Sequence, residues 1–318
     1  MFLLMIFIPL LPIAFNKKNI FKENSSENLI NSPSEDYFYI FDESSKKNLK
    51  IPEREFLYAT VATEMPVSFE MEALKAQSVA AYTYFSRARE NFRKKNGEGQ
   101  SEITVNSEKW EYYASCAQLK EKWGDKFEER YNKIKSAVDS VFGEVLEDNG
   151  NLILAVYHAM SSGETESSKD IFGGDLKYLT NVSSPGDKEA KGYETSAEFK
   201  MEEFKEIVKK AWEDSKFEGA PENWIKDIER TKAGGVKSLT ICSHKTTGRE
   251  VRAIFSLRSA DFDINYRNEK FIFTVKGYGH GVGMSQYGAQ FMAKQGADYK
   301  NILSWYYPGT VLVNRKKL

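Results

Sequence analysis

The sequence predicts an α+β fold in which a central alanine-rich helix packs with mixed and antiparallel strands, arranged as two lobes around a cleft. The helix is predicted by residues 69–96, where alanines form a small-residue face and bulkier apolar side chains recur at helical spacing. Short apolar runs on both sides of this helix have the composition of strands. With 318 residues, the chain is long enough for one large domain or two medium ones.

The composition excludes several classes of protein. Lys and Arg number 45 against 46 Asp and Glu, a net charge of -1, so no global field attracts nucleic acid. The aromatic content of 14% suits either ordinary packing or a carbohydrate groove. With only Cys116, Cys242 and 3 histidines, neither a disulfide framework nor a CxxC zinc cage is expected. We predict no metal and no cofactor, and the two cysteines could form a pair or remain buried thiols.

Residues 1–15 form an uninterrupted apolar stretch without a charge, followed by Lys17 and Lys18. As a helix this stretch would be ~22 Å long, marginal for a membrane span, and it lacks the basic start and cleavage site of a secretory signal. We interpret it as an N-terminal membrane anchor or signal-like segment, with the rest of the chain outside the cytoplasm. A buried N-terminal helix is the alternative. Residues 16–36 are polar and aperiodic, as in a flexible tether.

The predicted elements of the first half begin with a strand at Tyr37 and a turn over residues 42–47 that leads into a partner strand. A helix begins with Pro52-Glu53-Arg54-Glu55, so that Pro and acids lie in its first turn, and it ends near Met65-Pro66. Ser68 is the expected N-cap of the helix at 69–96. Another amphipathic helix covers 126–141, and strands at 144–146 and 151–157 flank a turn at 149–150.

The second half opens with a long loop, residues 159–185, of a length that usually indicates function. A helix is predicted at 196–212, and residues 190–235 have the polar character of an insertion. Strands at 236–242 and 262–275 flank a short helix at 249–257. Two helices, at 284–294 and 298–306, and a last strand at 310–313 complete the chain.

Three stretches place polar side chains where neither helix nor strand patterning requires them. In the first, Ala62-Thr63-Glu64-Met65-Pro66, Glu64 has a largely apolar neighbourhood. Burial there would disfavour the charged carboxylate and raise its pKa toward the range of a general acid. On the local sequence alone, a solvated glutamate at the end of a helix is the competing interpretation.

The second stretch runs from Tyr157 to Glu166 and brings hydroxyls, a histidine and carboxylates to the end of a predicted strand. His158 with Ser161 or Ser162 could form half of a hydrolase triad, but the G-x-S-x-G pattern of a nucleophile elbow is absent. A hydrogen-bonding loop is the favoured interpretation.

The third stretch, residues 277–289, has glycine at every second position from Gly277 to Gly283 and leads into a helix. Its spacing does not fit a dinucleotide-binding glycine loop, because Met284 stands where the third glycine would be. We interpret His280 as a structural or substrate-facing hydrogen-bonding residue rather than a metal ligand.

In this order, these stretches resemble the stage II sporulation protein D family of peptidoglycan lytic transglycosylases, which share a domain with amidase enhancer proteins. The resemblance covers residues 37–318 and leaves the anchor and tether as a membrane attachment. The matching segments are Val61-Ala62-Thr63-Glu64-Met65-Pro66, Glu72-Ala73-Leu74-Lys75-Ala76-Gln77-Ser78-Val79-Ala80-Ala81, residues 157–168, residues 279–289, and Tyr306-Tyr307-Pro308-Gly309-Thr310.

The resemblance implies that Glu64 is the catalytic acid and that Asp187 supports activity, since Ser184-Pro185-Gly186-Asp187 is similar to a family motif Ser-Pro-Trp-Asp. Gly186 departs from that motif by lacking the aromatic side chain, and Tyr82 stands where the family usually has an arginine. Some relatives hold zinc through Cys and His, which Cys116 alone does not reproduce. The expected substrate-binding or supporting residues are Gln77, His158, Ser161, Ser162, Thr165, Asp187, His280 and Gln286.

The implied activity is cleavage of the bond between N-acetylmuramic acid and N-acetylglucosamine with formation of a 1,6-anhydro ring, on glycan stripped of stem peptides during sporulation engulfment. A hydrolytic glycosidase needs two carboxylates, whereas this reaction needs one. The expected location is the membrane of the sporulation septum, with the catalytic domain outside the cytoplasm. The expected partners are a septal peptidoglycan amidase or peptidase and a recruiting membrane protein, and no nucleic acid. The alternative function is a non-catalytic peptidoglycan-binding enhancer of an amidase.

Overall fold

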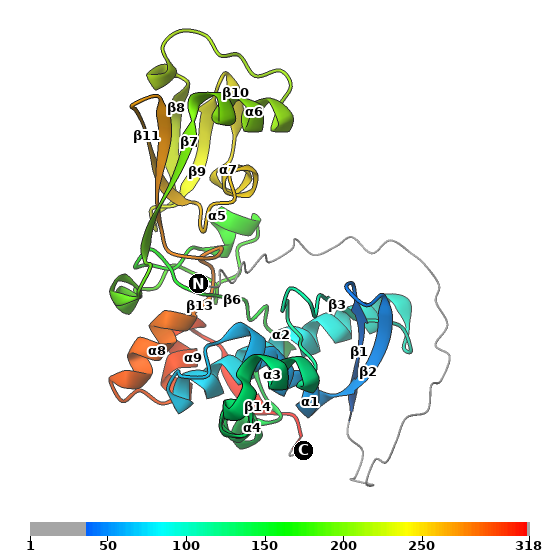
Figure 1. Cartoon of the computed structure of the whole chain (residues 1–318). Coiled ribbons are helices and arrows are strands. Elements are labelled where there is room, and N and C mark those ends of the chain that lie inside the picture. Colours follow the sequence, from blue (N-terminus) through cyan, green and yellow to red (C-terminus); the bar gives the residue numbers. More distant parts are fainter. Residues whose placement is uncertain (1–35, 317–318) are drawn as a thin grey trace. The chain divides into compact units, whose positions relative to one another are not determined.

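The computed structural model of the chain describes residues 36–316, which divide into two compact units (Figure 1). The first unit comprises residues 36–156, Gly296–Ile302 and residues 310–316, and the second comprises Tyr157–Gln295 and Leu303–Gly309. The predicted anchor at 1–15 and all of the predicted tether except residue 36 lie outside the described residues. Within residues 36–316, every helix falls short of the length or the apolar character that a membrane crossing needs.

The strands of the first unit form two small sheets. In one sheet the central strand β1 pairs antiparallel with β2 and parallel with β3, and in the other β4 lies between β14 and β5. The bounds are β1 Tyr37–Asp42, β2 Lys47–Pro52, β3 Ile103–Val105, β4 Glu144–Asp148, β5 Asn151–Leu152 and β14 Val311–Asn314. The predicted N-terminal hairpin is confirmed, whereas the single strand predicted at 151–157 is wrong, because only Asn151–Leu152 pairs with β4.

The predicted alanine-rich helix, α2, lies inside the first unit. All four of its predicted small-face alanines are fully buried: Ala73, Ala76, Ala80 and Ala81. The helix packs against α1, α4 and β4, as its small-residue face predicts. The bounds are α1 Glu53–Glu64, α2 Met71–Asn96, α3 Cys116–Trp123, η1 Gly124–Lys126, α4 Phe127–Val141 and, across the boundary of the two units, α9 Tyr299–Tyr306.

The predicted start of α2 is wrong by two residues. Ser68 is not the N-cap; Glu70 holds that position and makes no side-chain cap bond. The reason is a turn in which the Phe69 N–H donates to the Pro66 carbonyl at 2.9 Å and the Phe69 ring is buried. Burial of the ring outweighs the cap that Ser68 could have supplied.

Tyr82, where the resembled family usually has an arginine, lies against the fully buried carboxylate of Glu53 in the first unit. Its hydroxyl donates to Glu53 at 3.0 Å, and the Arg89 guanidinium forms an ion pair with the same carboxylate at 2.6 Å. Because positions 82 and 89 are two turns apart on α2, they share a face of the helix. Arg89 therefore provides a cation to the carboxylate that Tyr82 contacts.

The second unit contains two three-stranded antiparallel sheets and a short parallel pair. The strand orders are β11-β12-β7, β10-β9-β8 and β13-β6. Strand bounds are β6 Tyr157–His158, β7 Glu194–Lys200, β8 Ile225–Arg230, β9 Val236–Ile241, β10 His244–Thr246, β11 Asp261–Arg267, β12 Lys270–Lys276 and β13 Met284–Ser285. Helix bounds are α5 Ser168–Phe172, η2 Pro185–Glu189, α6 Met201–Ala211, η3 Pro221–Asn223, α7 Gly248–Ile254 and α8 Gln286–Lys294.

The helix predicted at 196–212 is wrong in its first part. Residues 194–200 form β7, whose burial alternates and whose Phe199 pairs with Phe271 on β12, so the period of two decides the structure. The predicted strand 262–275 is two strands, divided by a turn at Asn268 and Glu269, which both have positive φ. Residues 190–235, predicted as an insertion, supply strands to both three-stranded sheets.

Buried phenylalanines form the core of the second unit, with Phe204 of α6 stacked on Phe271 at a centroid distance of 3.9 Å. Helices α6 and α7 both contribute to this core. The overall class, α+β, is as predicted.

Candidate active site

Glu64 is the last residue of α1 and its side chain is buried, with 7% of its surface exposed. Burial raises the pKa of Glu64 to about 8, and the nearby charge of Glu111 adds to this, while a hydrogen bond from the backbone N–H of Tyr112 opposes it. The carboxyl is therefore protonated at neutral pH. The alternative interpretation from the local sequence, a solvated carboxylate, is wrong.

The loop that brings Tyr112 to Glu64 is held in an uncommon conformation. Trp110 and Tyr112 have φ of 61° and 64°, a region that non-glycine residues rarely occupy. The Thr60 hydroxyl on α1 donates to the Tyr112 carbonyl at 2.8 Å, and Asn106 pairs with Glu111 through two backbone hydrogen bonds. The surrounding structure thus fixes the backbone of the loop against the end of α1.

This loop was not among the three stretches predicted from the sequence. Tyr112 is hydrogen bonded to the Tyr84 hydroxyl of α2, and both rings contribute to the surroundings of Glu64. The run Trp110-Glu111-Tyr112-Tyr113 is the signal that could have indicated it, because three aromatic residues in a segment without strand or helix pattern are unusual. Gln77, also in the first unit, is fully buried on α2, so any part it takes is in positioning other groups.

In the second unit, a short parallel strand pair joins the other two predicted stretches. Tyr157 and His158 of β6 pair with Met284 and Ser285 of β13, and Met160 forms a further bridge with Tyr278. Stretches more than 110 residues apart in the sequence therefore share one local structure.

Asp187 ties these stretches together from a fully buried position. Its Oδ2 accepts hydrogen bonds from the Ser161 N–H at 2.7 Å and the Ser161 hydroxyl at 2.5 Å, and its Oδ1 accepts from the Ser285 hydroxyl at 2.6 Å. Ser285 is the N-cap of α8, which begins with the buried Gln286. Asp187 consequently positions two loops rather than offering a carboxylate to solvent.

The hydroxyl groups of the second stretch form hydrogen bonds within the protein. Ser162 donates to the Ala233 carbonyl at 3.1 Å, and Thr165 donates to the Thr180 carbonyl and accepts from the Val182 N–H. With Ser161 bound to Asp187, neither serine donates to His158. The arrangement of a Ser-His hydrolase is therefore not formed by these residues.

His158 and His280 both form hydrogen bonds with the backbone of Val282. The His158 Nδ1–H donates to the Val282 carbonyl at 3.1 Å, and the Val282 N–H donates to His280 Nδ1 at 3.0 Å. Burial lowers the pKa of His158 to about 4 and that of His280 well below its usual value, so both are neutral at pH 7. Gly279 has φ of 117°, and a Cβ there would lie 2.7 Å from His158 Cβ, so this glycine serves close packing.

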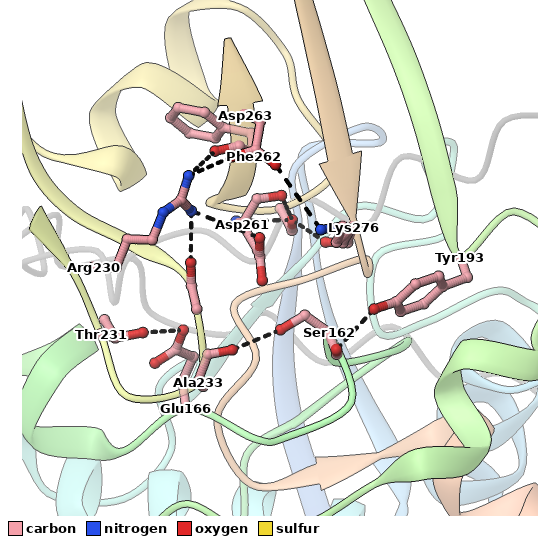
Figure 2. Close-up of polar contacts among 12 residues, drawn as sticks. Ser162, Glu166, Tyr193, Arg230, Thr231, Ala233, Asp261, Phe262, Asp263 and Lys276 are labelled. Carbon is pink, nitrogen blue, oxygen red and sulfur yellow. Dashed lines mark hydrogen bonds and ion pairs between the residues drawn. The ribbon is translucent and has the colours of Figure 1, made fainter. Parts of the chain in front are cut away.

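Glu166 is a buried carboxyl that the sequence analysis did not select. It accepts hydrogen bonds from the Thr231 hydroxyl at 2.8 Å and the Gly235 N–H, and burial raises its pKa to about 7. Figure 2 shows how the loop carrying Thr231 and Ala233 meets Glu166 and Ser162, with Arg230 directed toward Asp263. Residues from the predicted insertion therefore pack on the second stretch.

Within the described residues, 36–316, no group of three or more His, Cys, Asp or Glu side chains is placed to hold a metal ion. Cys116 and Cys242 are both free thiols, Cys116 exposed and Cys242 buried. Of the predicted site residues, Glu64 and Gln77 lie in the first unit and the remainder in the second.

The chain is similar to known sporulation proteins over most of its length. A family model described as stage II sporulation protein matches residues 42–147. Stage II sporulation protein D of Bacillus subtilis is 35% identical over 261 residues, which cover 82% of this chain and 74% of that protein. The chain belongs to the stage II sporulation protein D family. The Bacillus amyloliquefaciens protein of the same name is 35% identical over 263 residues, 81% of this chain and 73% of that protein.

The Bacillus subtilis protein named amidase enhancer is also similar. It is 28% identical over 306 residues, which cover 81% of this chain but only 40% of the enhancer.

The structure explains the departure at Gly186 from the resembled motif. A Cβ at position 186 would lie 2.2 Å from Cγ of Phe291, on α8. The Phe291 ring thus occupies the space where a side chain at position 186 would begin.

Proposed function

We propose that this member of the stage II sporulation protein D family is a peptidoglycan lytic transglycosylase that uses Glu64 as its single catalytic carboxyl. The observation that carries the proposal is the buried, hydrogen-bonded Glu64 at the end of α1, with its pKa raised to about 8. A carboxyl that remains protonated at neutral pH is the group that a glycosidic leaving oxygen requires.

The reaction balances with one carboxyl. Glu64 gives its proton to the oxygen between N-acetylmuramic acid and N-acetylglucosamine, and the bond from that oxygen to the muramic C1 breaks. The muramic C6 hydroxyl then attacks C1, and its proton passes to the Glu64 carboxylate, which restores the acid. Since the nucleophile belongs to the substrate, its effective molarity is high and no second carboxylate is needed to activate water.

Tyr112 supports the second half of this cycle. Its backbone N–H donates to the Glu64 carboxyl, and such a bond stabilises the carboxylate that exists after the first proton transfer. Because the backbone is fixed by the Thr60 hydroxyl, the donor is in place before the charge develops.

The proposed setting is the sporulation septum, with residues 1–15 as the membrane anchor and the folded units outside the cytoplasm. The proposed substrate is glycan from which an amidase or peptidase has removed the stem peptides, and a membrane protein recruits both enzymes. Protease treatment of intact cells tests the topology, since degradation of the folded units is expected and their full protection contradicts the proposal.

Purified Glu64→Gln protein, incubated with glycan strands that lack stem peptides, tests the chemistry. We expect loss of anhydro-ended products by mass spectrometry, while Glu55→Gln, an exposed glutamate on the same helix, retains the wild-type yield. Undiminished product from Glu64→Gln removes this residue from the mechanism.

A non-catalytic role as an enhancer of an amidase is the second candidate, favoured by the similarity to the protein named amidase enhancer. Sedimentation with purified sacculi and an assay of amidase rate separate the two functions. Binding and stimulation that persist in Glu64→Gln, without anhydro products from the wild type, favour the enhancer.

A further inference from the structure

Arg252 lies on a rigidly placed helix in the second unit. Helix α7 has a complete capping box at Thr247 and Glu250, and its Val251 belongs to the buried core. At Gly248 a Cβ would lie 2.1 Å from the Val236 carbonyl, so the helix rests directly on the backbone of β9. The position of the Arg252 side chain is therefore determined by packing.

Arg252 is a partly buried cation that no carboxylate neutralises within residues 36–316. Its Nε donates to the Leu257 carbonyl at 3.3 Å, which uses one of five donors. The titratable groups that act on it are Tyr278 and Arg249, and burial lowers its pKa to about 10, so it stays charged. Partial removal of a cation from water without an anionic partner carries a cost, which an anionic ligand at this position would offset.

The backbone connects Arg252 to the His158–His280 pair: its acceptor Leu257 precedes Arg258, whose carbonyl accepts a hydrogen bond from the Gly279 N–H at 2.9 Å. The positive charge of Arg252 helps to lower the pKa of both His158 and His280, and the charge of Arg249 helps to lower that of His280. In the described part of the chain, His158 Nε2 is buried without a hydrogen-bond partner, although its Nδ1–H is bound to Val282. The Phe172 ring, 41% exposed, lies 5.6 Å from the His280 ring, so this group of residues reaches the surface at α5.

We propose that Arg252, with Arg249 and the His158–His280 pair beside it, is a carboxylate-binding site for the lactyl group of N-acetylmuramic acid. The inference rests on the proposed function, because it takes its ligand from the proposed substrate. Once the stem peptide is removed, the lactyl carboxylate is the only charged group of the glycan. While the peptide is attached, the same carbon is an uncharged amide and carries a bulky chain.

The chemistry of the site fits this ligand. A guanidinium with free donors binds a carboxylate through charge-assisted and often paired hydrogen bonds. The exposed Phe172 ring, which lies against the His280 ring, offers an apolar surface to a pyranose face. The site thereby selects stripped glycan over peptide-bearing glycan.

The test measures binding of a stripped glycan tetrasaccharide to the full chain by calorimetry, in a Glu64→Gln background that prevents turnover. The same tetrasaccharide with its lactyl carboxylates converted to methylamides is the second ligand. We expect the carboxylate form to bind more tightly by roughly ten- to a hundredfold, as for charge-assisted hydrogen bonds. Arg252→Gln should abolish this difference, and the exposed Arg267→Gln on β11 should preserve it.

Stem peptides also carry carboxylates, so free stem tetrapeptide is the third ligand. Weak binding that is insensitive to Arg252→Gln is expected, and binding as tight as that of the stripped glycan assigns the site to the peptide and overturns the proposal. The proposal is also overturned if the Glu64→Gln protein that retains Arg252 binds the carboxylate and methylamide glycans with equal affinity.

Thermal unfolding of Arg252→Gln separates a binding role from a structural one. Since the arginine has no carboxylate partner in residues 36–316, the variant should be as stable as the parent or more stable. A marked loss of stability assigns Arg252 to the scaffold. All these readouts are independent of catalysis. Absence of anhydro products from the wild-type protein would refute the proposed function, and the binding result would be judged separately.

Discussion

The backbone N–H of Tyr112 donates a hydrogen bond to the carboxyl of Glu64, and Tyr112 itself has a left-handed φ of 64°. The strained residue is thus the one that contacts the proposed catalytic group. Strain of this kind persists where the surrounding structure over-determines the backbone, here through Thr60 and the pairing of Asn106 with Glu111.

Glu111 should tune the pH dependence of cleavage. The rate constant kcat/KM requires protonated Glu64 in the free enzyme, so it should fall as the pH rises through about 8. Because the charge of Glu111 helps to raise the pKa of Glu64, Glu111→Gln should move this alkaline limb to lower pH. The exposed Glu108→Gln in the same loop is the control, and identical profiles for all three proteins would exclude the coupling.

Glu64→Gln should stabilise the protein at alkaline pH. The pKa of Glu64 is raised from 4.5 to about 8, so stability is fully present below 4.5 and is lost as the pH rises through 8. Glutamine does not ionise, and the variant should gain on the order of a few kcal/mol over the wild type between these limits. Denaturant unfolding at pH 4 and pH 9 measures the difference in unfolding free energy between the variant and the wild type. A difference that does not increase with pH contradicts the burial of Glu64.

Asp187→Asn should disrupt both loops that Asp187 positions. An amide nitrogen would face the donors of Ser161 or Ser285 in place of an acceptor. The expected cost is about 2–4 kcal/mol of unfolding free energy. The exposed Glu189→Gln nearby should be neutral. If Asp187→Asn unfolds like the wild type yet loses cleavage, Asp187 acts on the reaction and not on the loops.

Gly186 and Phe291 should show strong coupling. Gly186→Trp alone collides with the Phe291 ring, and Phe291→Ala alone leaves a cavity, each costing roughly 1–4 kcal/mol. Combining the two changes should recover part of the loss, because the new indole can enter the vacated space. If the double variant loses the sum of the two single-variant losses in unfolding free energy, the two rings do not occupy the same space.

Helix α2 could be predicted from the sequence, because its apolar residues recur at helical spacing over a long segment. Its small-residue face also predicted a central position, and the alanines of that face are buried. Residues 194–200 were predicted as helix because β7 continues directly into α6, with no glycine or proline between the two elements. Glu64 could be selected from its apolar neighbours. The aromatic run around Tyr112 could mark that loop, but the effect of Glu111 and Tyr112 on Glu64 could not be predicted, because it depends on contacts between segments that are distant in sequence. Arg252 could not be selected, because its importance arises from a missing partner.

Cleavage of stripped glycan in heavy-oxygen water tests the central claim most directly. With wild-type protein, mass spectrometry should find new muramic ends that are anhydro and carry no heavy oxygen, because the attacking hydroxyl comes from the sugar. Glu64→Gln should yield no such ends. Reducing muramic ends labelled with heavy oxygen, or anhydro ends formed equally by Glu64→Gln, would contradict a transglycosylase that depends on Glu64.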